Sequence, residues 1–210
     1  MGIIPAVALS KIKRWYYKDF LSMQEIGRKL NVSSGAVVYF MRWHNLSRRT
    51  FSEISARRFD LKPLSFSVTN KLTAQQKNLR IIGAMLYWCE GFKGNEKSTN
   101  STVDFANSDP KMIAIFSRFL REIYRVDEKR LRVLLYCYSN QNVQQLISFW
   151  SKTTKIPKSQ FSKPYVRTDF REDGRKMQYG MIHLRYSDKK LLIELKNLID
   201  SMCRKNAPVG

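Results

Sequence analysis

The stretch from Leu79 to Lys93, LRIIGAMLYWCEGFK, is the longest run of apolar residues in the chain. Because residues 81–89 leave no polar face, we expect a helix that is buried on all sides. Gly91 is expected to end it in the left-handed conformation that glycine adopts readily. Glu90 then falls in the last turn, where the helix dipole disfavours a carboxylate. Lys93 or a divalent metal can compensate the negative charge of Glu90. The simpler interpretation is a core helix that ends in a solvated glutamate.

The charge of the chain narrows the class of partner. Lys and Arg number 38 against 17 Asp and Glu, for a net charge of +21. The excess is spread over the chain, with 14 basic and 4 acidic residues in 1–78 and 24 and 13 in 79–210. Such a balance favours a polyanion, with nucleic acid first and an anionic membrane surface second.

Cysteine usage and hydropathy restrict the compartment. The three cysteines are widely spaced and form no CxxC pair, which fits a reducing cytosol and argues against a disulfide framework or zinc site. No apolar run approaches the roughly 20 residues of a membrane span. We therefore expect a cytoplasmic, nucleoid-associated protein with no membrane partner and no small-molecule substrate.

Residues 1–59 have the pattern of a small all-α domain. Ser22 precedes Glu25 by three residues, the spacing of a capping box, and Ile26 and Leu30 follow at helical spacing. Ser33 or Ser34 can cap the next helix. A helix, a short turn and a capped helix form the helix-turn-helix layout.

The segment SMQEIGRKLNVSSGAVVYFMR resembles the helix-turn-helix of many bacterial regulators and recombinases. The resemblance implies that the helix from Ser34 to about His44 enters the major groove. Arg48 and Arg49 follow and can clamp phosphates. The alternative is a three-helix bundle whose serines only cap. The exposed candidates for DNA contact are Ser33, Ser34, Gly35, Tyr39 and Arg42.

Residues 60–72 are expected to be a linker, 73–204 a second domain and 205–210 a tail. Thr73 can cap the helix of the opening stretch, and strands are expected at 103–106, 131–138, 163–170 and 178–186. With helices near 110–123, 143–154 and 188–202, the order is α-β-α-β-α-β-β-α. We expect an α+β fold with an antiparallel sheet, whose last two strands are joined by a charged turn.

Two strand rows carry polar and aromatic side chains. Lys163, Tyr165 and Arg167 alternate on one face, and His183 and Arg185 share a row of the last strand. Such a face suits DNA backbone or groove contacts. An ordinary solvated sheet face explains it equally well.

GAMLYWCEG resembles a diverged LAGLIDADG motif, and YWCEGFK followed by VDFANSDPKMIAIFSRFL is similar to a group of bacterial helix-turn-helix proteins. In LAGLIDADG homing endonucleases, two such helices meet at a dimer axis and each supplies one acid to a shared metal site. The resemblance implies a homodimer, Glu90 as a catalytic, metal-binding acid and Mg²⁺ as cofactor. Lys93 would stabilise the developing charge, and Asp104 is either a second metal ligand or a solvated strand residue.

Two functions follow from these patterns. The first is a sequence-specific double-stranded DNA-binding protein that cleaves DNA with Mg²⁺, as a LAGLIDADG-type nuclease. The second is a non-catalytic transcriptional regulator or recombination accessory protein built on the same parts. RNA binding is a third class, which fits the charge and the aromatics but explains the helix-turn-helix poorly.

Overall fold

A computed structural model describes residues 4–92, 101–168 and 177–206. The chain divides into two compact units, Met1–Lys62 and Pro63–Gly210. The division falls inside the segment expected as a linker. The remainder of that segment packs on the second unit, because the backbone N–H groups of Ser67 and Thr69 donate to the carbonyls of Tyr124 and Ile123 at 3.0 and 2.8 Å.

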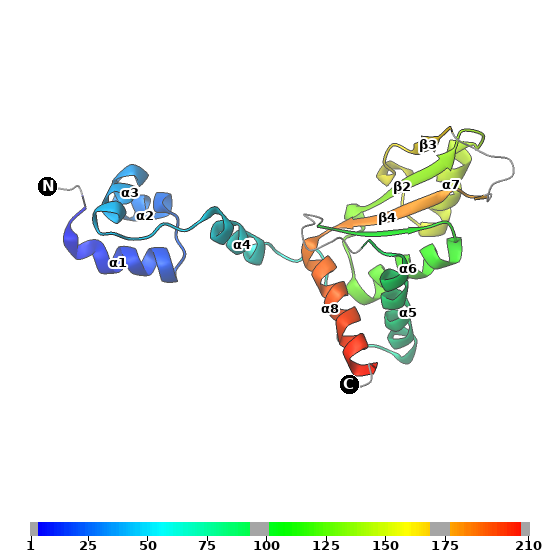
Figure 1. The fold of residues 1–210 in the computed structure, drawn as a ribbon, viewed down its shortest axis with the longest axis horizontal. Coiled ribbons are helices and arrows are strands. Elements are labelled where there is room, and N and C mark those ends of the chain that lie inside the picture. The colour runs from blue at the N-terminus through cyan, green and yellow to red at the C-terminus, as the bar shows by residue number, and fades with distance from the viewer. Residues whose placement is uncertain (1–3, 93–100, 169–176, 207–210) are drawn as a thin grey trace. The chain divides into compact units, whose positions relative to one another are not determined.

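The first unit is entirely helical in its described part (Figure 1). A capping box begins α2 as expected, since Glu25 N–H donates to Ser22 Oγ at 3.2 Å and Ser22 N–H donates to Glu25 Oε2 at 2.7 Å. Ser33, rather than Ser34, caps α3. The elements are a 3₁₀ turn at Ala6–Ala8, α1 at Leu9–Lys13, a π-helical turn at Arg14–Lys18, α2 at Met23–Leu30, α3 at Ser34–Trp43 and α4 at Phe51–Leu61.

A tight turn joins α2 to α3. Asn31 adopts the left-handed conformation at φ 53°, and Val32 N–H donates to Gly27 O at 2.9 Å. A Cβ on Gly27 would lie 2.7 Å from Val32 O, so only glycine permits this approach. The core beneath the turn consists of Ile4, Ala8, Ile12, Tyr16, Ile26, Val37, Phe40 and Met41.

The second unit has the predicted order of helices and strands. Thr73 caps its first helix, accepting from Gln76 N–H at 3.2 Å. The elements are α5 at Ala74–Glu90, β1 at Thr102–Asn107, α6 at Pro110–Tyr124, β2 at Leu131–Tyr138, α7 at Val143–Thr154, β3 at Tyr165–Arg167, β4 at Met181–Ser187 and α8 at Lys189–Asn206, with 3₁₀ turns at Glu128–Arg130 and Lys158–Gln160.

The sheet is mixed, and the prediction of an antiparallel sheet is wrong for one strand. Its order is β1-β4-β2-β3, with β4 antiparallel to both neighbours and β3 parallel to β2. The reason is α7, since a helical crossover between two adjacent strands makes them parallel. β3 and β4 follow one another in the chain but are not neighbours in the sheet, because β2 lies between them. The charged turn at 171–176 lies outside the described residues.

Helices α5, α6 and α8 lie together on one side of the sheet (Figure 1). β2 and β4 alternate along their length and β1 alternates from Thr102 to Ala106, so every second side chain of these strands points into this helical layer, whereas all three residues of β3 are exposed. Gly83 lets α5 approach α6 closely, because a Cβ there would lie 2.2 Å from Phe119 Cγ. The inward strand residues are Val103, Phe105, Leu131, Val133, Leu135, Cys137, Ile182, Leu184 and Tyr186.

The outer side of α5 corrects two expectations about the opening stretch. The helix buries Leu79, Ala84 and Tyr87, but an apolar stripe on its other side is exposed. Gly91 ends α5 in an extended conformation at φ −76° rather than a left-handed one. Glycine fits there because a Cβ would lie 2.4 Å from the Tyr87 ring. The exposed stripe consists of Ile81, Ile82, Met85, Trp88 and Phe92.

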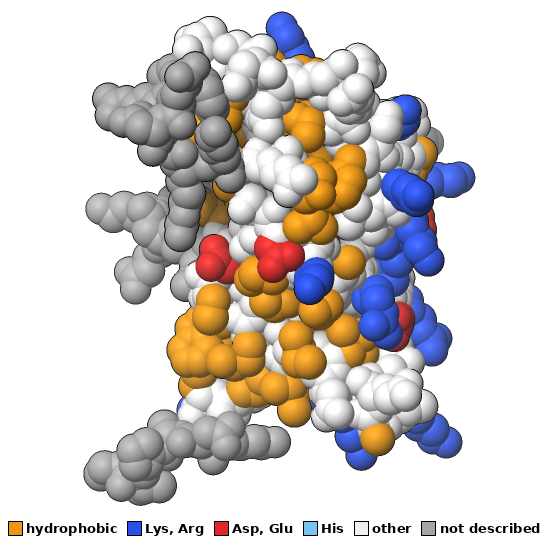
Figure 2. Space-filling view, turned by 90° about the vertical axis from the view of Figure 1, so that its right-hand side faces the viewer, with side chains coloured by type: hydrophobic (Ala, Val, Ile, Leu, Met, Phe, Trp, Pro, Cys, Tyr) orange, Lys and Arg blue, Asp and Glu red, His pale blue; other side chains and the backbone are white. Residues whose placement is uncertain are grey.

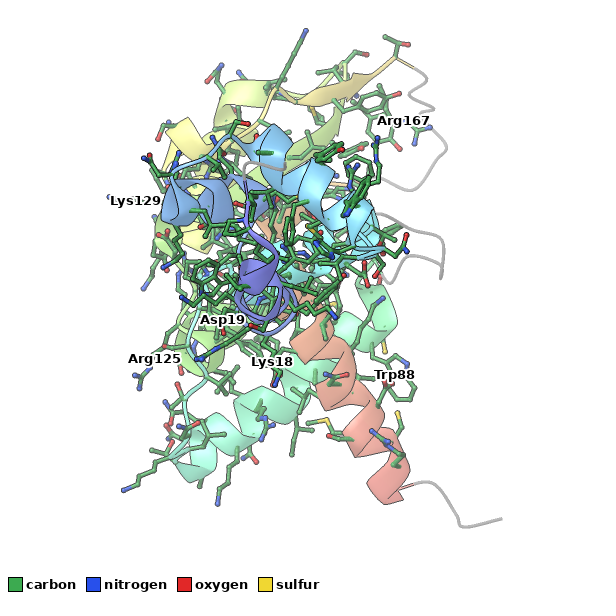
Figure 3. The ribbon with its side chains drawn as sticks, turned by 90° about the vertical axis from the view of Figure 1, so that its left-hand side faces the viewer. Lys18, Asp19, Trp88, Arg125, Lys129 and Arg167 are labelled. Carbon is green, nitrogen blue, oxygen red and sulfur yellow. The ribbon has the colours of Figure 1, made fainter. Side chains whose placement is uncertain are left out.

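Hydrophobic side chains gather on the side of the second unit where α5 lies, and Lys and Arg side chains line another side (Figure 2). Trp88 projects from the side opposite Arg125 and Lys129 (Figure 3). The unit thus separates an apolar surface from a basic one.

Candidate nucleic-acid interface

The outward face of α3 carries the predicted contact residues. Its inner face is held in the core by Val37, Phe40 and Met41. This leaves the opposite face in water, as a surface helix anchored on one side requires. Ser33, Ser34, Gly35, Tyr39 and Arg42 are all exposed.

Trp43 belongs to the same face and was missed from the sequence. It is 73% exposed, and its ring stacks on that of Tyr39 with centroids 6.3 Å apart and planes 23° apart. The signal was its spacing, since Trp43 follows Tyr39 by four residues and therefore shares its face. Together the Tyr39 and Trp43 rings form a small exposed apolar patch beside Arg42, and contiguous exposed apolar patches can mark contact surfaces.

The two arginines after α3 differ in their surroundings. Arg48 is exposed. The Arg49 guanidinium donates to Phe20 O at 3.1 Å and to Leu21 O, and it lies 4.1 Å from the Tyr16 ring centroid. Arg49 thus ties the segment after α3 to the loop that precedes α2, while Arg48 has its charge in solvent.

The outer face of the sheet brings four predicted residues together. Tyr165 pairs in register with Tyr136, and Arg167 pairs with Tyr138. His183 and Arg185 lie on the outward row of β4, next to β2. Lys163 is exposed in the loop that precedes β3. Arg167 lies at the periphery of the unit in Figure 3.

Tyr136 is a central residue of this face that was not predicted from the sequence. Its ring centroid lies 5.0 Å from that of Tyr165 and 4.9 Å from that of His183. The alternation of LRVLLYCY assigns Tyr136 and Tyr138 to the outward row, and that signal was sufficient to find them.

Asp104 is engaged by two basic side chains on the same face. Its Oδ1 lies 2.8 Å from His183 Nδ1, and Arg185 Nε donates to its Oδ2 at 2.8 Å. Burial raises the pKa of Asp104, but the contacts with His183 and Arg185 outweigh burial and lower the pKa below its ordinary value. The carboxylate therefore stays ionised and neutralises part of the basic surface.

These contacts bear on the expected magnesium site. Both carboxylate oxygens of Asp104 lie against nitrogen atoms of basic side chains, and the Arg185 charge disfavours a metal cation at this carboxylate. Glu90 is exposed at the end of α5, and no group of three His, Cys, Asp or Glu able to hold a metal occurs among the described residues. Lys93 lies outside the described residues. One carboxylate per chain would leave most of the octahedral positions of Mg²⁺ to water and to phosphate oxygens of the nucleic acid.

The fold defines a mixed α+β protein with a small helical unit and a larger unit built on a four-stranded sheet. No protein family, curated protein or solved structure matches the chain. Among the described residues, none of the helices is both long and apolar enough for a membrane span.

Proposed function

We propose that this protein binds double-stranded DNA in a sequence-specific manner and reads it with α3. The observation that supports the proposal best is the outward face of α3, where Tyr39, Arg42 and Trp43 are exposed together beside a buried core face. An α-helix fits the major groove, and arginine can form paired hydrogen bonds with a guanine edge. Tyr39 and Trp43 would contact thymine methyl groups or sugars.

The charge supplies the non-specific part of this affinity. A net charge of +21 opposes the phosphate backbone, and Arg48 lies close to α3 in sequence with its charge in solvent. Phosphate contacts position a protein on DNA, and binding then weakens with salt because counterions are released. The hydroxyls of Ser33 and Ser34 at the start of α3 would add contacts to the DNA phosphate backbone.

We further propose that two copies associate through the exposed stripe of α5. Ile81, Met85 and Trp88 recur at helical spacing and are 52%, 41% and 43% exposed. A second copy buries the same stripe against itself, as a twofold interface requires. A homodimer would present two α3 helices to one DNA site.

Of the two functions expected from the sequence, the non-catalytic one is supported better. The engagement of Asp104 leaves one candidate acid, Glu90, at the end of α5. Glu90 ends α5, the helix that carries the proposed dimer stripe, so a dimer could bring two Glu90 side chains together. For this reason a magnesium-dependent, LAGLIDADG-type nuclease is the second candidate. We therefore propose a DNA-binding regulator or recombination accessory protein.

Selection from a random duplex library tests the proposal. The full chain is immobilised, bound duplexes are recovered over several rounds and the enriched pool is sequenced. Enrichment of a defined motif supports sequence-specific binding. Recovery of unenriched sequences throughout would overturn it.

A further inference from the structure

We propose that the outer face of the sheet binds unpaired nucleobases by stacking them on Tyr165, Tyr136 and His183. This inference rests on the proposed function for its nucleic-acid partner, and it assigns a different ligand, single-stranded nucleic acid, to a different surface. It can fail while duplex binding by α3 holds.

Three rings from three adjacent strands form a row across the sheet. Tyr165 lies on β3, Tyr136 on β2 and His183 on β4, with centroids 5.0 and 4.9 Å apart and planes 42° and 35° apart. The spacing follows from the separation of neighbouring strands, about 4.8 Å. The chain that enters β4 passes close to the backbone carbonyl of Tyr136. Only glycine fits there, because Gly180 has a φ of 65° and a Cβ on it would lie 2.5 Å from Tyr136 O.

The row ends in an accessible ring. Tyr165 is 56% exposed on β3, which is the last strand of the described sheet. Tyr136 and His183 are partly exposed beside it. An exposed tyrosine at a sheet edge offers a ring face, and each base has a π face to match it.

Basic groups border the row. Arg132 is exposed on the outward row of β2, and Arg167 lies 5.8 Å from the Tyr138 ring centroid on the same face. Arg185 lies on β4, where Asp104 offsets its charge. Stacking rings within a basic groove are the combination that binds single strands without strong sequence preference.

The geometry favours unpaired bases over duplex DNA. Bases inside a duplex stack on one another and expose only their edges and the backbone. A side-chain ring therefore stacks on a base only where the base is unpaired. A row of rings on an open sheet face therefore suits single-stranded nucleic acid better than the groove of a DNA duplex.

Fluorescence anisotropy with the full chain tests this inference. The probes are oligo-dT, oligo-rU and an abasic deoxyribose oligonucleotide of the same length, which keeps the phosphates and lacks the bases. We expect oligo-dT or oligo-rU to bind more tightly than the abasic strand. The tighter of the two identifies DNA or RNA as the source of the bases.

Substitutions then locate the site. Tyr165→Ala should weaken binding of the preferred strand by about 5- to 150-fold, and Tyr165→Phe should retain it. Val166→Ala is the matched control, because Val166 is the next residue of β3 and points to the other face.

Three results would overturn the inference. The first is equal binding of the abasic and base-containing strands, which would leave only a charge effect. The second is unchanged affinity in Tyr165→Ala. The third is the absence of single-strand binding by wild type. If a duplex motif is nevertheless enriched in the selection, this inference is refuted and the proposed function of α3 stands.

Discussion

His183 Nδ1 and Asp104 Oδ1 lie 2.8 Å apart on the outer face of the sheet, where they join β4 to β1. Arg185 completes the cluster through Asp104 Oδ2. Because the two contacts together lower the pKa of Asp104, the folded chain binds fewer protons than the unfolded chain in acid. The cluster therefore contributes stability above the unfolded pKa of about 3.9 and loses it as pH falls through the lowered folded value.

Replacing Asp104 tests this cluster. Asp104→Asn should reduce the free energy of unfolding at neutral pH by ~1–3 kcal/mol, because charged hydrogen bonds are lost from a largely buried site. The difference from wild type should shrink as pH falls below about 4. Urea unfolding from neutral pH into acid measures both effects. Asp200→Asn, at an exposed acid of α8, is the control, and a pH-independent difference for Asp104→Asn would contradict the account.

Substitutions of the neighbouring residues Arg48 and Arg49 are expected to change different properties, DNA binding for Arg48 and stability for Arg49. Arg49→Ala should lower the melting temperature of the first unit, because its guanidinium holds Phe20 and Leu21 carbonyls and covers Tyr16. Arg48→Ala should leave melting unchanged and reduce the salt dependence of duplex binding by about one ion. Calorimetry and binding at several salt concentrations separate the two. The opposite assignment of effects would show that Arg49, and not Arg48, contacts phosphate.

The apolar stripe of α5 predicts self-association. Wild type should sediment as a dimer, and Met85→Glu should sediment as a monomer because it places a charge in the stripe. Val7→Glu, at an apolar residue that is 84% exposed in the first unit, should stay dimeric. A wild type that remains monomeric across a range of concentrations would refute the proposed interface.

Glu90 separates the two functions. If the chain cleaves DNA, Glu90→Gln should abolish magnesium-dependent nicking of a selected duplex and leave its affinity unchanged, whereas Asp200→Asn should nick normally. We expect no nicking from wild type, because Asp104, the other candidate acid, is engaged by His183 and Arg185. A gel assay of supercoiled plasmid carrying the selected motif, with and without magnesium, gives the answer. If wild type nicks DNA with magnesium and Glu90→Gln does not, the protein is a nuclease and the proposed function as a regulator is wrong.

Local sequence signals predicted much of the fold. The capping boxes at Ser22 and Thr73, the alternation of residues 131–138 and the helix beginning at Pro110 each depend on near neighbours in the chain. The structure places β2 and α7 at their predicted bounds. Such features need only spacing and capping chemistry to be recognised.

Features that depend on distant residues were missed. The pairing of β3 with β2 depends on where α7 carries the chain, which periodicity does not report. The run of apolar residues in α5 showed no polar face, yet Met85 and Trp88 are exposed, because periodicity cannot tell whether a partner covers a helix. The same limit hid the engagement of Asp104, since its partners His183 and Arg185 come from a strand about 80 residues further along the chain.

The most direct test of the central proposal compares a selected duplex with a scrambled one of the same length and composition. Their affinities for wild type and Arg42→Ala are measured at one fixed salt concentration. We predict that wild type prefers the selected duplex and that Arg42→Ala reduces this preference by about 5- to 150-fold. Equal affinity of wild type for both duplexes, or an unchanged preference in Arg42→Ala, would contradict the assignment of α3 as the reading helix.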